Sequence, residues 1–177
     1  MSYLAIAATA LTLLCLFGIW WIYREVRPLV MGGGPFVPTS FETVQQMINA
    51  AKLTPADNIV DLGSGDGRIV LEAVRTLGCR GLGVEIDPGL VRLSQTRAQE
   101  MGLEDNATFV QQDFWKTDLS SATVVFLFQV PRAMKRLDVL LKERLRPGSR
   151  IVSNYFIFPD WEPLYQKGEV TVYRVSK

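Results

Sequence analysis

A glycine-rich loop runs from Asp61 to Arg68 and reads Asp-Leu-Gly-Ser-Gly-Asp-Gly-Arg. It lies between an apolar, strand-like segment and a helix-like segment. Glycines permit positive φ and let a ligand approach the backbone closely, and the free N–H groups of a helix start suit an electron-rich ligand. We therefore predict a ligand-binding loop in which Gly63, Ser64, Gly65 and Gly67 contact the ligand.

Three carboxylates, those of Asp61, Glu85 and Asp113, stand at the ends of successive strand-like segments. The carboxyl ends of parallel strands line the crevice in which open α/β sheets bind ligands. At the end of the first segment, the Asp61 carboxylate can meet a cationic amino-acid head group. At the end of the second, the Glu85 carboxylate can accept two ribose hydroxyls. At the third end a carboxylate can accept from an adenine amino group, with Phe114 packing on the ring. We expect Asp61 and Glu85 in an open crevice.

A dinucleotide is the main alternative ligand for this loop. A dinucleotide loop has the spacing Gly-x-Gly-x-x-Gly, whereas here the third glycine, Gly67, comes one residue early. Asp61 would also repel a pyrophosphate. A further alternative is that the three acids only cap helices or solvate strand ends.

The composition excludes several kinds of chemistry. The chain has no histidine, so imidazole metal sites and Ser-His-Asp triads are ruled out. Its 19 basic and 18 acidic residues leave a formal charge of +1, which argues against a nucleic-acid partner. Two cysteines are too few for a disulfide framework or a cysteine-rich zinc site.

Strand-like and helix-like segments alternate from residue 58 onward. This alternation predicts an α/β fold with a Rossmann-like, doubly wound, mostly parallel sheet. Residues 124–128 are apolar throughout, as expected of a central strand that is covered on both faces. The expected strands are 58–62, 81–86, 107–112, 123–129, 149–154 and 170–175, and the expected helices are 66–78, 88–101 and 131–145.

One more helix should precede the first strand. Thr39-Ser-Phe-Glu42 has the form of a capping box, which opens a helix that ends near Lys52. Its apolar residues recur at helical spacing and should share one buried face. They are Phe41, Val44, Met47, Ile48 and Ala51.

Residues 2–23 carry no charged side chain, and residues 1–23 hold 19 of the roughly 85 apolar residues that make up the chain's 48% apolar content. As a helix this segment would span about 33 Å, against about 30 Å for the hydrocarbon core of a bilayer. Tyr3 at one end and Trp20, Trp21 and Tyr23 at the other match the aromatic belts of membrane interfaces. A signal peptide would need a positive start and a small-residue cleavage site, which this segment lacks. We predict a transmembrane helix in contact with the lipid bilayer.

Arg24 and Arg27 follow this segment and no positive side chain precedes it. The positive-inside tendency then places the folded body on the cytoplasmic side of a single-pass protein. The membrane would be the inner membrane in a bacterium or a mitochondrial membrane in a eukaryote. The predicted division is an anchor at 1–27, a Pro/Gly-rich linker at 28–38 and a folded domain at 39–177.

These motifs together resemble the class I S-adenosylmethionine-dependent methyltransferases. The sequence is most similar to small membrane-associated protein-lysine methyltransferases, whose animal members modify the mitochondrial adenine nucleotide translocase and the ATP synthase c-subunit. The shared stretches are Pro35-Phe36-Val37-Pro38-Thr39, Asp61 to Arg68, Val84-Glu85-Ile86-Asp87, Asp113-Phe114-Trp115-Lys116 and Val130-Pro131. The family's Arg-Phe-Pro-Phe-Pro-like run is replaced here by residues 154–159.

The resemblance implies that residues 39–177 form the methyltransferase domain and that S-adenosyl-L-methionine is the cofactor. It adds Thr39 and Ile86 to the cofactor-binding residues named above. Methyl transfer is an in-line displacement that needs no metal, but an acceptor lysine must lose its proton. Gln129 and Tyr155, near the ends of the fourth and fifth strands, are our candidate catalytic residues. Other candidates for the acceptor pocket are Phe36, Trp115, Pro131, Asn154 and Trp161.

We therefore predict a membrane-anchored methyltransferase that modifies a lysine side chain of a membrane protein. Three alternatives stay open at this point. The acceptor could be a lipid or a quinone, the chain could be a nicotinamide-dinucleotide-binding oxidoreductase, or it could be a non-catalytic cofactor-binding anchor protein.

Overall fold

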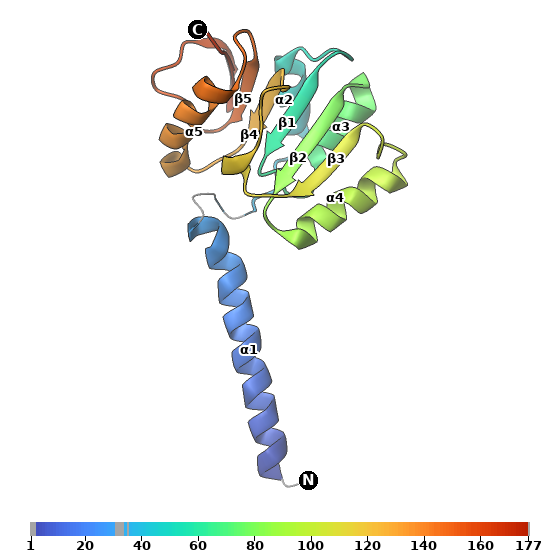
Figure 1. Ribbon diagram of the computed structural model, residues 1–177, viewed down its shortest axis with the longest axis vertical. Helices are drawn as coiled ribbons and strands as arrows, with labels where there is room; N and C mark the ends of the chain where they lie inside the picture. Colours follow the sequence, from blue (N-terminus) through green and yellow to red (C-terminus); the bar gives the residue numbers. More distant parts are fainter. Residues whose placement is uncertain (1–2, 31–33, 35, 177) are drawn as a thin grey trace. The chain divides into compact units, whose positions relative to one another are not determined.

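The computed structural model describes residues 3–30, 34 and 36–176, so parts of the predicted linker lie outside the described residues. The chain divides into two units, one ending at Pro35 and the other beginning at Phe36 (Figure 1). In the described part of the first unit there is one helix, α1, Tyr3–Val30. This helix includes the first three residues of the predicted linker 28–38.

Within α1, residues Ala5–Ile22 are long and apolar enough to cross a membrane, and the rest of the structure buries none of them. The hydroxyls of Thr9 and Thr12 donate to the carbonyl oxygens of Ala5 and Ala8, each at 2.9 Å. The two hydroxyl protons of this stretch therefore have acceptors within the helix itself.

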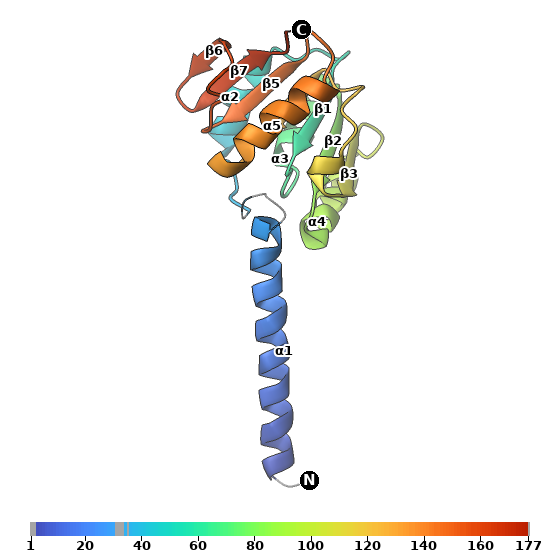
Figure 2. The ribbon, with the colours of Figure 1, turned by 60° about the vertical axis from the view of Figure 1, so that its left-hand side comes forward.

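The second unit contains a seven-stranded sheet with the order β3-β2-β1-β4-β5-β7-β6 (Figures 1 and 2). The first five strands in this order are parallel, and β7 and β6 are antiparallel to their neighbours. The doubly wound prediction is thus confirmed, with the strand order reversing between β1 and β4. The strands are β1 Asn58–Leu62, β2 Arg80–Glu85, β3 Ala107–Gln111, β4 Val124–Leu127, β5 Arg150–Asn154, β6 Pro163–Lys167 and β7 Val170–Arg174.

Helices cover both faces of this sheet. Buried side chains of α2 (Phe41–Ala51), α3 (Arg68–Leu77) and α4 (Pro88–Glu100) share one core cluster, which also contains Phe126 of β4. The second cluster lies on the other face, where α5 (Pro131–Arg144) contributes Leu137 and the short helix η1 (Phe114–Lys116) contributes Trp115. β4 is buried along its whole length, as predicted for a central strand.

Three local predictions need correction. The N-cap of α2 is Ser40, whose Oγ accepts from the Thr43 N–H at 3.1 Å, so the capping box does not begin at Thr39. Phe41 does not join the buried face of α2 but is 72% exposed. β6 was not predicted, because all five of its residues are exposed and the segment lacks the alternation of a half-buried strand.

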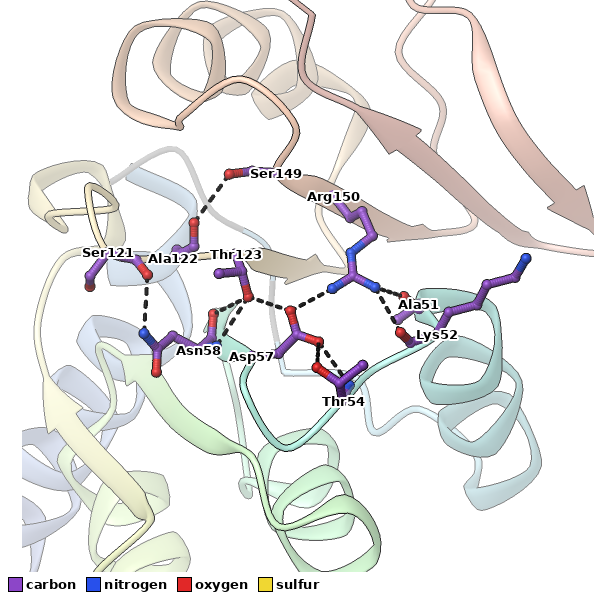
Figure 3. A network of polar contacts seen from close by, with 10 residues as sticks. All are labelled: Ala51, Lys52, Thr54, Asp57, Asn58, Ser121, Ala122, Thr123, Ser149 and Arg150. Carbon is purple, nitrogen blue, oxygen red and sulfur yellow. Dashed lines mark hydrogen bonds and ion pairs between the residues drawn. The ribbon is translucent and has the colours of Figure 1, made fainter.

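A polar network joins the amino ends of β1, β4 and β5 (Figure 3). Asp57 accepts from Thr123 Oγ1 at 2.6 Å and pairs with the Arg150 guanidinium at 2.5 Å. Arg150 also donates to the carbonyl oxygens of Ala51 and Lys52, where α2 ends. This network therefore ties α2 to the edge of the sheet opposite the strand-end acids.

Candidate active site

The glycine loop connects β1 to α3 at the carboxyl edge of the sheet. The N–H groups of Gly63 and Ser64 donate to Val84 O of β2 at 2.8 and 3.0 Å. Gly63, Gly65 and Gly67 have φ values of 85°, 55° and 79°, a region that L side chains rarely adopt.

The space beside each of these glycines is also filled. A Cβ at Gly63 would lie 2.6 Å from Gln129 Nε2, and a Cβ at Gly65 would lie 2.3 Å from Phe36 Cε2. At Gly67 the Phe109 ring would be 2.8 Å away. Other side chains of the protein thus approach the loop backbone closely. The one beside Gly63 is Gln129, a candidate catalytic residue.

Glu85, the last residue of β2, holds the loop in place. Its Oε2 accepts from Gly65 N–H at 2.9 Å, and its Oε1 accepts from Ile86 N–H at 2.7 Å and Asp87 N–H at 2.9 Å. These bonds fix the carboxylate at the β2 strand end. A Glu85 substitution would therefore disturb the loop itself, whatever contact its carboxylate makes with a ligand.

Asp61 lies near the end of β1 and is only 3% exposed, which corrects the expectation of an open crevice. Burial raises the pKa of this carboxyl to about 8, and the nearby charges of Glu85 and Asp66 act in the same direction. A buried carboxylate with no cation beside it is costly. The site therefore favours a ligand that brings positive charge to Asp61.

A cluster of cations around Asp66 was not predicted from the sequence. Its carboxylate pairs with Arg68 at 2.6 Å and with Arg97 at 2.8 Å. Burial acts to raise the pKa of Asp66, but hydrogen bonds from these two guanidinium groups outweigh it and lower the pKa to about 2. Arg68 also donates to Thr39 O at 2.5 Å. The segment that enters α2, which contains two predicted site residues, is thus fixed to the glycine loop.

The predicted adenine-side residues lie just beyond β3. Asp113 is the N-cap of η1, and its Oδ1 accepts from Trp115 N–H at 3.1 Å. The half-buried Phe114 ring lies 4.6 Å from the Trp115 ring, centroid to centroid. Ile86, at the end of the neighbouring strand β2, is likewise partly exposed. The adjacent ends of β2 and β3 therefore offer a ligand the apolar side chains of Ile86 and Phe114 and the carboxylate of Asp113.

Gln129 follows β4 and is 6% exposed. Its Nε2 donates to Leu62 O at 2.9 Å, while its Oε1 is buried and has no hydrogen-bond partner among the described residues. Ser64 Oγ and Asn154 Oδ1, at the ends of β1 and β5, are also buried and unpartnered. Buried polar atoms without a partner cost free energy, so three of them at neighbouring strand ends fit a polar ligand.

Tyr155 directly follows β5 and has a φ of 70°, an uncommon value for a residue with a side chain. Its N–H donates to Glu169 O at 2.7 Å, which holds this conformation, and its ring is 58% exposed. The ring of Phe156 lies 4.9 Å from it and also packs against Phe128 after β4. Strained residues concentrate at functional sites.

Two other acceptor candidates pack elsewhere. Trp161 lies against Phe158 and Tyr173 and donates to Asp138 of α5. Trp115 is buried beneath the Arg136 guanidinium, which lies 4.0 Å from its ring centroid. Among the residues that the structure describes, no group of three His, Cys, Asp or Glu side chains could hold a metal ion.

Residues 61–165 match the family model of the ANTKMT methyltransferase domain. A protein-lysine N-methyltransferase of Saccharolobus islandicus is 35% identical over 130 residues, which cover 73% of this chain and 81% of that protein. The chain belongs to the ANTKMT methyltransferase family. The human lysine N-methyltransferase of the ATP synthase c-subunit is 35% identical over 76% of this chain, but the match covers only 57% of the human enzyme. The chain thus spans little more than half the length of this relative.

A solved RNA methyltransferase from Salinibacter ruber, in complex with S-adenosyl-L-homocysteine, has a TM-score of 0.77 and 40% identity to this chain. The match covers 80% of this chain and 95% of that one. A methyltransferase from Geobacter sulfurreducens, also with S-adenosyl-L-homocysteine, has a TM-score of 0.60 and 25% identity over 73% of this chain and 53% of that one. The predictions of a class I methyltransferase fold and of S-adenosylmethionine as cofactor are confirmed, and the nicotinamide alternative is not supported.

Proposed function

We propose that this chain transfers a methyl group from S-adenosylmethionine to a lysine side chain of a membrane protein. The observation that carries the proposal is the position of Gln129, whose buried Oε1 has no partner beside the glycine loop of a methyltransferase. An amide oxygen there can accept an N–H from an amine and orient it. The names of the Saccharolobus and human relatives support lysine as the acceptor.

The cofactor-binding roles follow the charges and surfaces of the site. Asp61 would meet the amino-acid ammonium group, and Glu85 would accept the ribose hydroxyls. Asp113 would accept from the adenine amino group, with the ring between Ile86 and Phe114. The loop residues Gly63, Ser64, Gly65 and Gly67 would line the cofactor together with Thr39, which Arg68 holds in place.

The acceptor amine must reach the site uncharged. Desolvation lowers the pKa of an amine, and the aromatic rings of Tyr155, Phe156 and Phe128 offer a cation-binding wall before the proton is lost. Tyr155 would contact the lysine side chain at the opening. The ammonium proton would pass to solvent water beside the exposed Tyr155. Gln129 would then hold the neutral amine by one N–H, with the nitrogen lone pair free for the methyl group that S-adenosylmethionine supplies when bound.

The N-terminal helix supports a membrane-borne acceptor. Ala5–Ile22 suits a single transmembrane span, and Arg24 and Arg27 suit the cytoplasmic side. We propose an anchor at 1–27, a linker at 28–38 and a methyltransferase domain at 39–177. Relatives of this family are named for lysine methylation of the ATP synthase c-subunit and of the adenine nucleotide translocase. Anchoring would raise the effective concentration of an acceptor in the same membrane.

The test is an assay on membranes with S-adenosylmethionine labelled in its methyl group. The wild-type chain should label a membrane protein, and mass spectrometry should place the label on a lysine. Asp61→Asn serves as the control variant, because it removes the charge that meets the cofactor while keeping the size of the side chain. Label confined to lipid or quinone extracts would refute the protein acceptor and favour a lipid or quinone methyltransferase.

RNA is a second candidate acceptor, because the Salinibacter structure is described as an RNA methyltransferase. The formal charge of +1 argues against it, since RNA binding depends on excess positive charge. The same assay with added total RNA decides the matter. Label that is sensitive to ribonuclease and absent from protein would replace the lysine proposal with this one.

A further inference from the structure

Exposed apolar side chains gather at two short segments of the second unit. Among the residues that the structure describes there, ten large apolar side chains are at least 40% exposed, and five of them fall within residues 36–41 and 155–157. Exposed apolar side chains that are scattered singly are ordinary, but a cluster marks an interaction surface. We call this cluster the apolar rim: Phe36, Val37, Phe41, Tyr155 and Ile157, which are 48% to 72% exposed.

Both segments belong to the carboxyl edge of the sheet, where the candidate active site lies. Phe36 packs on Gly65 of the glycine loop, and Arg68 lies over the Phe41 ring at 5.4 Å from its centroid. Residues 155–157 directly follow β5, whose neighbour β4 leads to Gln129. Both parts of the apolar rim therefore lie at the edge of the sheet that holds the candidate site, and not on a remote face.

The connection to α1 indicates which partner covers this rim. Only five residues separate Val30, at the end of α1, from Phe36. A connection of this length extends no further than about 20 Å. A bilayer that holds α1 is thus within reach of the rim. Burial of apolar area contributes about 25 cal/mol per Å², and a tether removes most of the entropic cost of association.

We propose that the apolar rim rests in the headgroup region of the bilayer that holds α1. The active site then faces lysines that lie at the membrane surface. Lysines of a membrane protein that lie far above the bilayer would not be acceptors. This inference rests on the membrane anchoring in the proposed function. It adds a lipid-binding surface on the methyltransferase domain and makes acceptor choice depend on height above the bilayer.

Fluorescence quenching in proteoliposomes tests the proposal with the full chain. The variant Cys15→Ser/Ile157→Cys carries a single accessible thiol, because Cys79 is buried. An environment-sensitive dye on this thiol should be quenched at least threefold more by headgroup-level spin-labelled lipid than the same dye in Cys15→Ser/Val139→Cys. Val139 is a fair control, since it is equally exposed but belongs to α5. Equal quenching at both positions would overturn the proposal.

The native Cys15 separates failure of the rim from failure of the anchor. Dye on the exposed Cys15 of the otherwise unaltered chain should be quenched by lipid labelled deep in the acyl chains. Quenching at Cys15 without quenching at position 157 refutes the rim alone. No quenching at Cys15 refutes the anchor and the rim together.

An activity measurement gives a second readout. Ile157→Glu should raise KM for a membrane-embedded acceptor about tenfold and leave kcat on a soluble lysine peptide unchanged, whereas Val139→Glu should change neither. Equal loss with both acceptors would show that position 157 acts on folding or on the chemistry and would refute the lipid contact.

Discussion

Asp61 shows how burial and charge combine at one residue. The carboxyl is buried, and its pKa of about 8 means that the ligand-free protein holds it largely protonated at neutral pH. A cationic ligand reverses this, because an ion pair favours the charged form. The residue therefore links cofactor binding to proton release.

Calorimetry in buffers of different ionisation enthalpy should detect this link. Below pH 8, binding of S-adenosylhomocysteine should release protons as Asp61 ionises, and affinity should rise with pH until the ligand's own amino group begins to lose its proton. Asp61→Asn should bind at least tenfold more weakly and with no proton release from this site. Proton release that the substitution leaves unchanged would assign the effect to another group.

The same shift has a consequence for stability. The pKa of Asp61 is higher in the folded chain than the ordinary value of 3.8, so the folded state binds the proton more tightly. This contribution is complete below about pH 4 and is lost as pH rises to about 8. The melting temperature of the ligand-free protein should therefore depend less on pH in Asp61→Asn across that interval. Identical pH profiles for the two proteins would contradict the raised pKa.

Gln129 offers a residue-scale test of the catalytic proposal. Gln129→Ala removes both the bond to Leu62 O and the unpartnered Oε1. Hydrogen-bond losses of this kind amount to about 1–3 kcal/mol, or a fall in kcat of roughly 5- to 150-fold. Affinity for S-adenosylhomocysteine should change less than threefold in equilibrium binding. A loss of cofactor affinity as large as the loss of kcat would make Gln129 a loop support only.

At the scale of elements, Arg68 connects the start of α3 to the segment entering α2. Arg68→Ala should free Thr39 O and leave Asp66 with one cation instead of two. Backbone amide exchange over residues 39–43 should become faster, and cofactor affinity should fall about tenfold. Arg75→Ala is the matched control, since Arg75 is on the same helix and forms an exposed pair with Glu72. Equal effects of the two substitutions would show that Arg68 does not specifically hold the segment that enters α2.

The network at the opposite edge of the sheet is a stability element. Arg150→Ala leaves the buried Asp57 without its cation and should cost about 3 kcal/mol in urea unfolding. Burial acts to raise the pKa of Asp57, but hydrogen bonds from Thr123 and Arg150 outweigh it and lower the pKa below 3.8. Its contribution is therefore present above about pH 4 and is lost as pH falls further. A midpoint of unfolding unchanged by the substitution would contradict this account.

At the scale of the whole molecule, the anchor is the feature to challenge. Leu13→Arg/Leu14→Arg places two charges within the Ala5–Ile22 span, each unfavourable by about 3 kcal/mol at a helix centre. The chain should move to the soluble fraction after carbonate extraction, keep its activity on a lysine peptide and lose most activity on a membrane acceptor. Leu13→Phe/Leu14→Phe should behave as the wild type. Retention of the charged variant in the membrane would argue against the span.

The sequence alone predicted the features that depend on neighbouring residues. The glycine loop, the strand-end positions of Glu85 and Asp113, and the α/β alternation all follow from local spacing and hydrophobic pattern, and the structure places them close to the expected residues. The apolar stretch within α1 is a local property too, because it needs only composition and length.

Contacts between distant segments decided the rest. Asp61 is buried by the folded chain although it lies at a strand end. Phe41 is exposed because α2 packs on β5 and β7 through its other face, which carries Val44 and Met47. The pairing of Arg68 with Asp66 and Thr39, and the addition of β6 to the sheet edge, likewise join residues through the fold. Burial and long-range pairing depend on which surfaces meet, so no local pattern could predict them.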